Sequence, residues 1–375
     1  MEYKPYILGL NHSLPDSALC ETEDLYQRVG HNTGNLAFHY AIRNQLNIST
    51  PAVHWEAPVE KIDAAGSMAI LPCANQVGAH LDYGNLAKKF SAIKNPIVAI
   101  GLGAQAGLDG KIPQVPQGTL NWLKAISEHS IGTAPNISVR GPFSKQVLEH
   151  YGFGDNVVAL GCPTLFINPD PELGKKIANR IKEPKRIAVA AGHQRWMHLS
   201  KIEASLARMV TVTNGSYIGQ SPLEMVKLTR GEADKLSEFE LSQCRDYAMP
   251  EMDIAEFSTW SQKFGNVFFD IPAWMEHYRH FDFVIGARIH GIMLALQAGI
   301  PAICIVHDSR THELCTTMKV PFVMAKDVQG GVERKKLLKL FDFDPDEFDN
   351  NRKNLYLKYK EFLFSNNLKF GFINF

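Results

Sequence analysis

Residues Phe283–Val306 read FVIGARIHGIMLALQAGIPAICIV, in which a buried strand, a helix and a second buried strand follow one another. The first apolar run ends at Arg288 and His290, and Gly291 opens an apolar helix. Strand–helix–strand units of this kind build parallel sheets. In open α/β sheets, ligands bind beyond the carboxyl ends of the strands. The segment therefore predicts a parallel-sheet fold and a site at the edge of that sheet.

The same alternation of short apolar runs with amphipathic stretches continues through most of the chain. It predicts an α/β fold of two Rossmann-like parallel-sheet domains that face a cleft. We expect an N-terminal domain at 1–170, a C-terminal domain at 171–335 and a helical tail at 336–375 that packs on the body. The boundary falls in a polar, proline-containing stretch between Asn168 and Lys185. The expected strands lie in PIVAIGLGAQ (96–105), NISV (136–139), VVALGCPTLF (157–166), RIAVAAG (186–192), SYIGQ (216–220), VFFDIP (267–272), DFVIGA (282–287), PAICIV (301–306) and VPFVMA (320–325).

Length and composition agree with two globular domains. The chain has 375 residues, of which 45% are apolar and 21% charged, and a domain takes roughly 150 residues. Lys+Arg and Asp+Glu both number 39. A balanced chain has no overall field for nucleic acid or an acidic membrane, so we expect no nucleic-acid partner. Partners must be selected by local sites.

The cysteine pattern and the absence of long apolar runs bear on location. The six cysteines are scattered, without a CxxC pair, which favours buried thiols in a reducing compartment and no disulfides. The N-terminus lacks the basic start and apolar core of a signal peptide, and no run reaches the ~18 apolar residues of a spanning helix. We therefore expect a cytoplasmic protein, with contact at the cytosolic membrane face left open.

Two predicted strands end in an arginine, Arg140 after ISV and Arg288 after DFVIGA. A helix that starts near Gly291 would add backbone N–H groups and a positive dipole end, which suit an anion. His290 adds a group that exchanges protons near neutral pH. A structural ion pair and a helix cap explain either residue alone, but the two together favour an anion site with an acid or base in it.

Several stretches resemble the polysaccharide pyruvyl transferase family. GARIHGIMLALQAGIPAICI (286–305) and HDSRTHEL (307–314) look like the C-terminal signature of that family, an Arg-x-His-Gly segment followed by an Ala-x-x-x-Gly-x-Pro segment. NISVRGPFSKQVLEHYG (136–152) resembles its Ser-x-Arg segment, and GHNTGNLAFHYAI (30–42) its Asn-x-Gly-Asp entry motif. The pieces follow the order of the family across nearly the whole chain.

The resemblance implies a fold similar to GT-B glycosyltransferases and the transfer of pyruvate from phosphoenolpyruvate to a sugar as a cyclic ketal. It assigns Arg140, His290 and Arg310 to the phosphoenolpyruvate site, with Arg288 and Gly291 beside them and His290 as the candidate general acid. Two positions depart from the family pattern. Asn35 replaces an acidic residue, and Arg310 stands where a Lys is more usual, which preserves charge but changes reach and hydrogen-bond geometry.

The acceptor side of the cleft is assigned to Asn32, Gly34 and Asn35, for which a turn and helix cap is an equally good interpretation. Asp308 is added to this group as a candidate base, or as the ion partner of Arg310. No metal site is predicted, and no cofactor is expected because phosphoenolpyruvate is a co-substrate.

Two other functions stay open at this point. A glycosyltransferase with a nucleotide-sugar donor would also need cations and a helix N-terminus, and a non-catalytic glycan-binding relative would keep the fold without the reaction. The expected partners are phosphoenolpyruvate and a glycan or lipid-linked oligosaccharide acceptor. Peripheral membrane contact and a homo-oligomer are compatible with the sequence.

Overall fold

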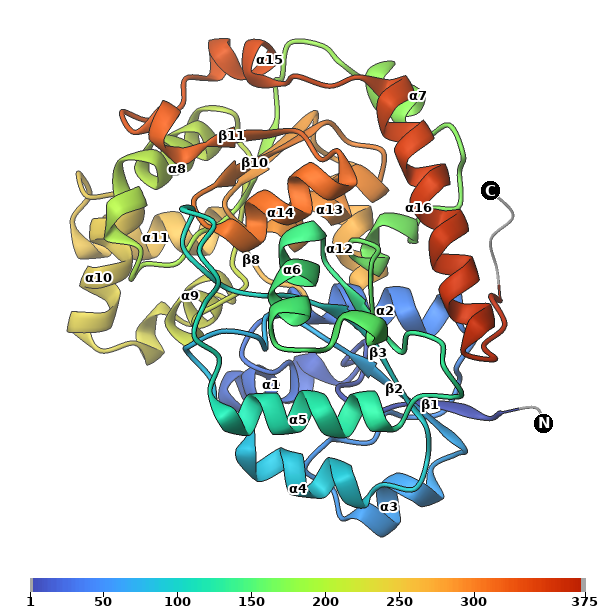
Figure 1. The fold of residues 1–375 in the computed structure, drawn as a ribbon. Helices are drawn as coiled ribbons and strands as arrows, with labels where there is room; N and C mark the ends of the chain where they lie inside the picture. Colours follow the sequence, from blue (N-terminus) through green and yellow to red (C-terminus); the bar gives the residue numbers. More distant parts are fainter. Residues whose placement is uncertain (1–2, 372–375) are drawn as a thin grey trace.

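A computed structural model describes residues 3–371, and in it two parallel sheets form two lobes (Figure 1). The sheet of the first lobe has the order β1-β2-β3-β4-β5. Its strands are β1 (Pro5–Ile7), β2 (Met68–Pro72), β3 (Ile97–Leu102), β4 (Ile137–Val139) and β5 (Val157–Ala159), and every pair is parallel. A further parallel bridge joins Leu8 to Val53. Val53 lies on the side of β1 away from β2, because the N–H of Leu8 bonds to Ile70 while that of Gly9 bonds to Val53.

The sheet of the second lobe has the order β11-β10-β9-β6-β7-β8. Its strands are β6 (Ile187–Ala190), β7 (Ser216–Ile218), β8 (Gly265–Asn266), β9 (Phe283–Gly286), β10 (Ala302–Val306) and β11 (Phe322–Met324), again all parallel. In chain order within the lobe this is 6-5-4-1-2-3, the arrangement of dinucleotide-binding folds read from the other edge. The expected fold class, two parallel-sheet α/β lobes facing a cleft, is confirmed.

Two expected strands differ from the structure. VFFDIP lies outside the ladder, because Leu14 of the first lobe donates to the carbonyl of Phe269 and Ser13 forms an antiparallel bridge with Asp270. VVALGCPTLF stays extended only as β5 and then forms a 3-10 turn at Pro163–Phe166.

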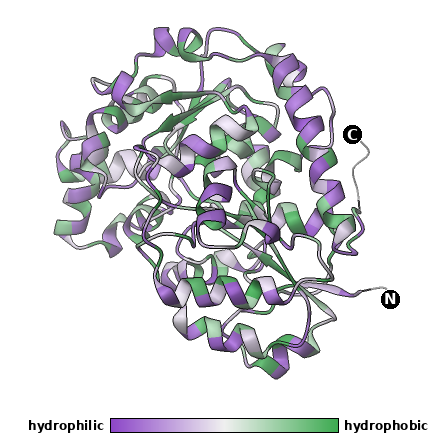
Figure 2. Ribbon diagram, in the orientation of Figure 1, coloured by the Kyte–Doolittle hydropathy of each residue, from purple (hydrophilic) through white to green (hydrophobic). Residues whose placement is uncertain are grey.

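Helices surround both sheets. Those of the first lobe are α1 (Thr22–Arg28), α2 (Asn35–Gln45), α3 (Val59–Ala64), α4 (Gly84–Ala92), α5 (Gln117–Glu128) and α6 (Pro142–His150). Next come α7 (Leu173–Ala178), α8 (Ser200–Val212), α9 (Leu223–Thr229), α10 (Glu238–Ala248), α11 (Ile254–Phe264), α12 (Ile271–Tyr278), α13 (Ile289–Gln297) and α14 (Ser309–Met318). The chain then forms α15 (Leu337–Leu340) and the long α16 (Pro345–Ser365). Figure 2 shows apolar strands and hydrophilic outer helix faces.

Successive side chains along the strands of the first sheet point alternately into two hydrophobic cores. Tyr6 and Leu8 face one core with Trp122 of α5, whereas Ile7 faces a second core that continues into the other lobe. This period of two is that of a strand with both faces buried. The continuous second core fixes the two lobes against each other.

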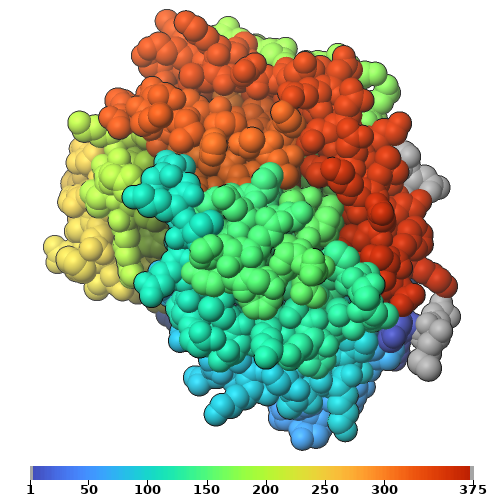
Figure 3. All heavy atoms as spheres, viewed as in Figure 1, coloured from blue at the N-terminus to red at the C-terminus, as the bar shows by residue number. Residues whose placement is uncertain are grey.

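Polar contacts add to this joint. Glu313 of α14 accepts from the N–H of Ser144 at 2.7 Å and from its hydroxyl at 2.6 Å, at the start of α6 in the other lobe. Ser309 exchanges hydrogen bonds with Ala106 on the segment between β3 and α5. Figure 3 shows this teal segment reaching onto the second lobe. The start of α14 is thereby held against the first lobe.

The C-terminal helix runs along both lobes. Arg352 of α16 is fully buried and donates to the carbonyls of Asn168 and Asp170 at 2.8 Å each. Tyr359 stacks on Phe166 with ring centroids 5.6 Å apart. Residues 372–375 of the predicted tail lie outside the described residues. Between residues 3 and 371, no helix combines the length and the apolar character needed to cross a bilayer.

Candidate active site

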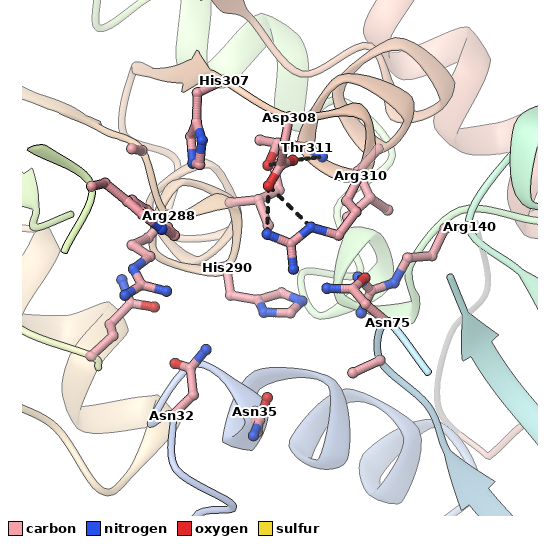
Figure 4. Close-up of a pocket in the computed structure, with 16 residues that line it drawn as sticks. Asn32, Asn35, Asn75, Arg140, Arg288, His290, His307, Asp308, Arg310 and Thr311 are labelled. Carbon is pink, nitrogen blue, oxygen red and sulfur yellow. Dashed lines mark hydrogen bonds and ion pairs between the residues drawn. The ribbon is translucent and has the colours of Figure 1, made fainter. Parts of the chain in front are cut away.

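A small pocket lies between the lobes at the carboxyl ends of both sheets (Figure 4). We call it the interlobe pocket, and its volume is about 90 Å³. It is lined by Asn32, Asn35, Ala74, Asn75, Arg140, Trp196, Gln220, Ala287, Arg288, Ile289, His290, His307, Asp308, Arg310, Thr311 and Leu314. In the second sheet the chain order reverses between β6 and β9, and Arg288 follows β9. The pocket is therefore at the switch point where open α/β sheets bind ligands.

Most of the predicted site residues meet in this pocket. Arg140 comes from the first lobe, and Arg288, His290 and Arg310 come from the second. Asn32, Asn35 and Asp308 also line it, whereas Gly34 and Gly291 do not. Side chains from both lobes thus line one pocket, and Figure 4 shows Arg288 and Arg140 on opposite sides of it with His290 and Arg310 between them.

The two glycines serve packing between elements. A Cβ on Gly291 would lie 2.8 Å from Ala190 Cβ and 2.8 Å from Gln220 Nε2, so this position lets α13 approach β6. A Cβ on Gly34 would lie 2.7 Å from Gln220 Oε1 and 3.4 Å from His290 Cβ. Gly34 thus brings the start of α2 close to α13. Helix α13 itself begins at Ile289, earlier than the sequence suggested, and Arg288 is its N-cap.

Arg140 is held by three features of the neighbouring strands. It is only 3% exposed, and its Nε donates to the carbonyl of Gly101 at 3.0 Å. Its Nη1 donates to Oδ1 of Asn75. Gly101 has φ +82°, a conformation that glycine adopts without strain, and a Cβ on Gly103 would lie 2.7 Å from Arg140 Cδ. Gly101 and Gly103, at and just after the end of β3, therefore make room for the Arg140 side chain and hold it in place.

Replacing Gly103 with alanine should displace Arg140, because the new Cβ would also lie 3.0 Å from Asn75 Oδ1. We expect about a tenfold loss of affinity for an anion that uses Arg140, the cost of weakening one charged hydrogen bond. Titration of anion binding by calorimetry measures this. Gly330→Ala is the matched control, because a Cβ there meets nothing within 4 Å. Equal affinities for the two variants would contradict this role of Gly103.

Arg288 lies between polar and aromatic neighbours. Its Nη2 donates to the carbonyl of Ser221 at 2.8 Å, and its Cζ lies 4.6 Å from the ring centre of Trp196. Burial and the nearby Arg310 lower the pKa of Arg288 to about 10. The side chain therefore remains a cation at neutral pH. Stacking on Trp196 offsets part of its desolvation.

Asp308 belongs with Arg310 at the start of α14. Its Oδ2 accepts from Arg310 Nε at 3.0 Å, and its Oδ1 accepts from the N–H and hydroxyl of Thr311. Burial opposes ionisation, but the charges of Arg310 and His307 lower the pKa of Asp308 to about 2. An ionised carboxylate with its oxygens occupied is a weak base. Of its two sequence interpretations, the geometry favours the ion partner and helix cap.

Each pocket arginine keeps N–H groups that no described residue accepts. Among residues 3–371, Arg140 Nη2, Arg288 Nη1 and Arg310 Nη1 have no hydrogen-bond partner. Arg288 Nε is buried and also lacks one. Of these donors, Arg288 Nε is fully buried, and a buried donor without a partner is costly. Free guanidinium N–H groups of this kind are suited to binding an anion.

His290 is buried and neutral in this state. It is 8% exposed, its Nε2 lies 3.8 Å from Sγ of Cys162, and its ring centre lies 5.4 Å from that of Phe38. Burial, followed by the charge of Arg140, lowers the pKa of His290 to about 3. Without a bound anion the imidazole is therefore unprotonated at neutral pH. A general acid at this position must acquire its proton when the anion binds.

Asn35 forms hydrogen bonds that help to explain why an amide stands here in place of the acidic residue of the family pattern. Its Nδ2 donates to the carbonyls of Val29 and Gly30 at 3.0 Å each. His39, one turn later, donates to the carbonyl of Asn35 at 2.8 Å. An aspartate at this position could not donate to the two carbonyls. The amide therefore stabilises the turn before α2 while lining the pocket.

Among the pocket residues that sequence reasoning missed are four polar or aromatic side chains that come after strands. Asn75 follows β2, Gln220 follows β7 and His307 follows β10, while Trp196 lies after β6. The ring of Trp196 lies 4.3 Å from that of His307, between that residue and Arg288. The signal that could have found Asn75, Gln220 and His307 is the one that found Arg288, a polar residue just beyond a buried strand, whereas Trp196 lies too far past β6 for that signal.

No group of three or more His, Cys, Asp or Glu side chains within the described range 3–371 is arranged to hold a metal ion. All six cysteines are free thiols.

Comparison with solved structures finds similar overall architecture at low identity. UDP-N-acetylglucosamine 2-epimerase from Rickettsia bellii is 14% identical with a TM-score of 0.45, covering 97% of this chain and 96% of that one. The Methanocaldococcus jannaschii UDP-GlcNAc 2-epimerase, in complex with UDP-GlcNAc and UDP, is 10% identical with a TM-score of 0.43, covering 95% and 99%. These values are too low to carry an argument about function.

Comparison of sequences is more specific. No functionally curated protein matches the chain significantly. The family model of polysaccharide pyruvyl transferases matches residues 32–309, well over half of the chain. The matched range includes Asn32, Arg140, Arg288 and His290 but ends at Ser309, one residue before Arg310. The chain belongs to the polysaccharide pyruvyl transferase family.

Proposed function

We propose that the protein transfers the enolpyruvyl group of phosphoenolpyruvate to a sugar of a polysaccharide or of its lipid-linked precursor, forming a cyclic pyruvate ketal and phosphate. The observation that supports this most is the convergence of three arginines and one histidine on the interlobe pocket. Phosphoenolpyruvate carries a phosphate and a carboxylate on a three-carbon unit. Arginine forks suit both groups, and a small pocket suits a small donor.

The proposed reaction forms two C–O bonds at the same carbon, the first by addition and the second by displacement of phosphate. A proton is delivered to the methylene carbon of the enol, and a cation-like centre develops at the carbon that bears the phosphate ester. One sugar hydroxyl attacks this carbon and loses its proton. The second hydroxyl then forms the other C–O bond and loses its proton as the phosphate leaves with the C–O electron pair. One pyruvate ketal and one phosphate result, without any oxidant or cofactor.

His290 is the proposed proton donor. The negative charges of bound phosphoenolpyruvate offset the effect of Arg140 and should raise the pKa of His290 from about 3. The arginines stabilise the phosphate as charge returns to it. Asp308 keeps Arg310 in place through their ion pair. The base that receives the hydroxyl protons is not assigned to a residue.

Phosphoenolpyruvate should protect the protein against thermal unfolding. At about 100 times its dissociation constant, the ligand should raise Tm by roughly 5 °C, because binding to the folded state alone contributes about 2.7 kcal/mol. Differential scanning fluorimetry measures this, with UDP-glucose and UDP-N-acetylglucosamine as controls. Protection by nucleotide sugars but not by phosphoenolpyruvate would contradict the proposal and favour a glycosyltransferase.

The decisive assay is turnover. Purified protein, phosphoenolpyruvate and a panel of free and lipid-linked glycans should release phosphate and give a ketal whose methyl group is visible by NMR. Phosphate release without a ketal would indicate hydrolysis. The absence of both products across the panel would contradict the proposed activity.

A further inference from the structure

A second and larger cavity adjoins the interlobe pocket in the first lobe. Its volume is about 470 Å³, within the range of about 300–1,000 Å³ typical of small-molecule sites. It shares Asn35, Ala74 and Asn75 with the interlobe pocket. We call it the β1–β2 cavity. A molecule in it would border the site of the donor directly.

The topology of the first sheet places this cavity where a ligand is expected. The segment at Val53 lies on one side of β1, and β2 lies on the other. The chain order thus reverses between β1 and β2, which makes their carboxyl ends a switch point. The cavity is lined by residues just beyond these strands, Leu10 after β1, Trp55 after Val53 and Gln76 after β2. Each sheet therefore has one site at its own switch point.

The charges of the two sites differ. The interlobe pocket is lined by three arginines and one aspartate. The β1–β2 cavity is lined by no Lys or Arg, and its one carboxyl side chain is that of Glu56. A phosphate or diphosphate would find no Lys or Arg there, only the imidazoles of His31, His39 and His54. The cavity therefore suits a neutral ligand.

The side chains of the cavity combine aromatic faces with amide and imidazole groups. Trp55 and Tyr83 supply large rings, and Trp55 is partly exposed. Aromatic rings bind the apolar C–H faces of sugars, while amides and carboxylates bind hydroxyls. Aromatic rings with one solvent-exposed edge are suited to such amphipathic contacts.

Gln76 is a buried residue whose side-chain NH2 group has no hydrogen-bond acceptor among the described residues 3–371. It is 5% exposed, and its Oε1 accepts from the N–H of Ala74 at 2.6 Å. No residue of the described chain, 3–371, accepts from its Nε2, and the side chain lines the cavity. The amide donor is thus free to meet a ligand in the cavity. A hydroxyl of a bound ligand would accept from this group.

From these features we propose that the β1–β2 cavity binds the neutral sugar of the acceptor glycan. Trp55 supports the sugar ring, Gln76 donates to a hydroxyl, and the hydroxyl pair that reacts passes over Asn35 and Asn75 into the interlobe pocket. The assignment as acceptor rests on the proposed pyruvyl transfer, but binding of a neutral glycan in the cavity does not.

The test applies the 375-residue chain, without phosphoenolpyruvate, to an array of neutral, acidic and phosphorylated glycans. NMR titration with the neutral oligosaccharide that binds most strongly follows. Trp55→Ala and Gln76→Ala should each weaken this oligosaccharide at least about tenfold, as expected for a central contact residue. Trp55→Phe should retain most of the affinity. Phe239→Ala, at an aromatic residue of α10 that is 71% exposed and outside both cavities, should change nothing.

The outcomes separate this inference from the proposed function. Thermal protection by phosphoenolpyruvate should be equal in the wild type and Trp55→Ala, because that ligand lies in the other pocket. If no neutral glycan binds, or if binding is unchanged in both alanine variants, the inference is wrong even where phosphoenolpyruvate binds. If neutral glycans bind through Trp55 but phosphoenolpyruvate does not bind, the inferred glycan site stands, whereas the proposed function and the assignment of that glycan as acceptor fail.

Discussion

Replacing His290 with glutamine should lower kcat by about 10²–10⁴-fold, the usual contribution of a general acid, while the affinity for phosphoenolpyruvate changes much less. Glutamine retains a similar size and can still donate a hydrogen bond, but it cannot deliver a proton to the methylene carbon. The arginines of the interlobe pocket remain in place to bind the anion. Steady-state kinetics and calorimetric titration separate the two effects.

The pH dependence of binding gives the same residue a second readout. The pKa of His290 is about 3 in the free protein, so at neutral pH the imidazole starts without its proton. If bound phosphoenolpyruvate raises that pKa, binding takes up about one proton at this group. Affinity should then fall as pH rises through the pKa of the bound state. Calorimetry in buffers of different ionisation enthalpy measures the uptake.

His290→Gln should lack this proton uptake, while the phosphate of the ligand titrates equally in both proteins. His277→Gln is the matched control, because burial lowers the pKa of His277 to about 4, its side chain bonds to Ser216, and neither residue lines the pocket. Equal uptake by the wild type and His290→Gln would mean that His290 stays neutral in the complex. Equal kcat values would remove it from the reaction.

The alignment of strand ends is what made the site predictable. Arg140 and Arg288 were selected because each follows a buried strand, and the parallel order of both sheets brings these ends to the same cleft. The period-two pattern of a strand and the glycine-rich turn after it are local properties of the chain, so both can be recognised from a single sequence. The family resemblance added Arg310, which lies on a helix start and has no strand signal of its own.

The remaining features depend on packing that no local pattern encodes. Gly291 has the sequence of an anion-binding turn, but its missing Cβ makes room for Ala190 of another strand. The low pKa of His290 results from Arg140 and from burial between the lobes. The strand expected at VFFDIP was lost to pairing with Leu14, more than 250 residues away. These three features are determined by tertiary contacts between segments that are distant in sequence.

Replacing Arg140 with leucine should raise the dissociation constant for phosphoenolpyruvate by about 10²–10³-fold, because a buried charged contact is worth several kcal/mol. Arg140 is only 3% exposed and is already held by hydrogen bonds to Gly101 and Asn75. Its side chain therefore loses little conformational entropy when Nη2 donates to the anion. Arg140→Lys should recover part of the affinity, because lysine keeps the charge without the planar fork. Calorimetry measures all three proteins.

The variant also leaves the carbonyl of Gly101 without this donor, so a stability loss of about 1–3 kcal/mol is expected and must be measured by denaturant unfolding. Arg195→Ala is the matched control, since Arg195 is 69% exposed, pairs with Glu224 and does not line the pocket. It should bind phosphoenolpyruvate as the wild type does. If folded Arg140→Leu binds within about threefold of the Arg195→Ala control, a difference of under 1 kcal/mol, the first lobe contributes no cation to the donor. The anion would then be held by cations of the second lobe alone, and the first lobe would contribute at most the amides of Asn32, Asn35 and Asn75.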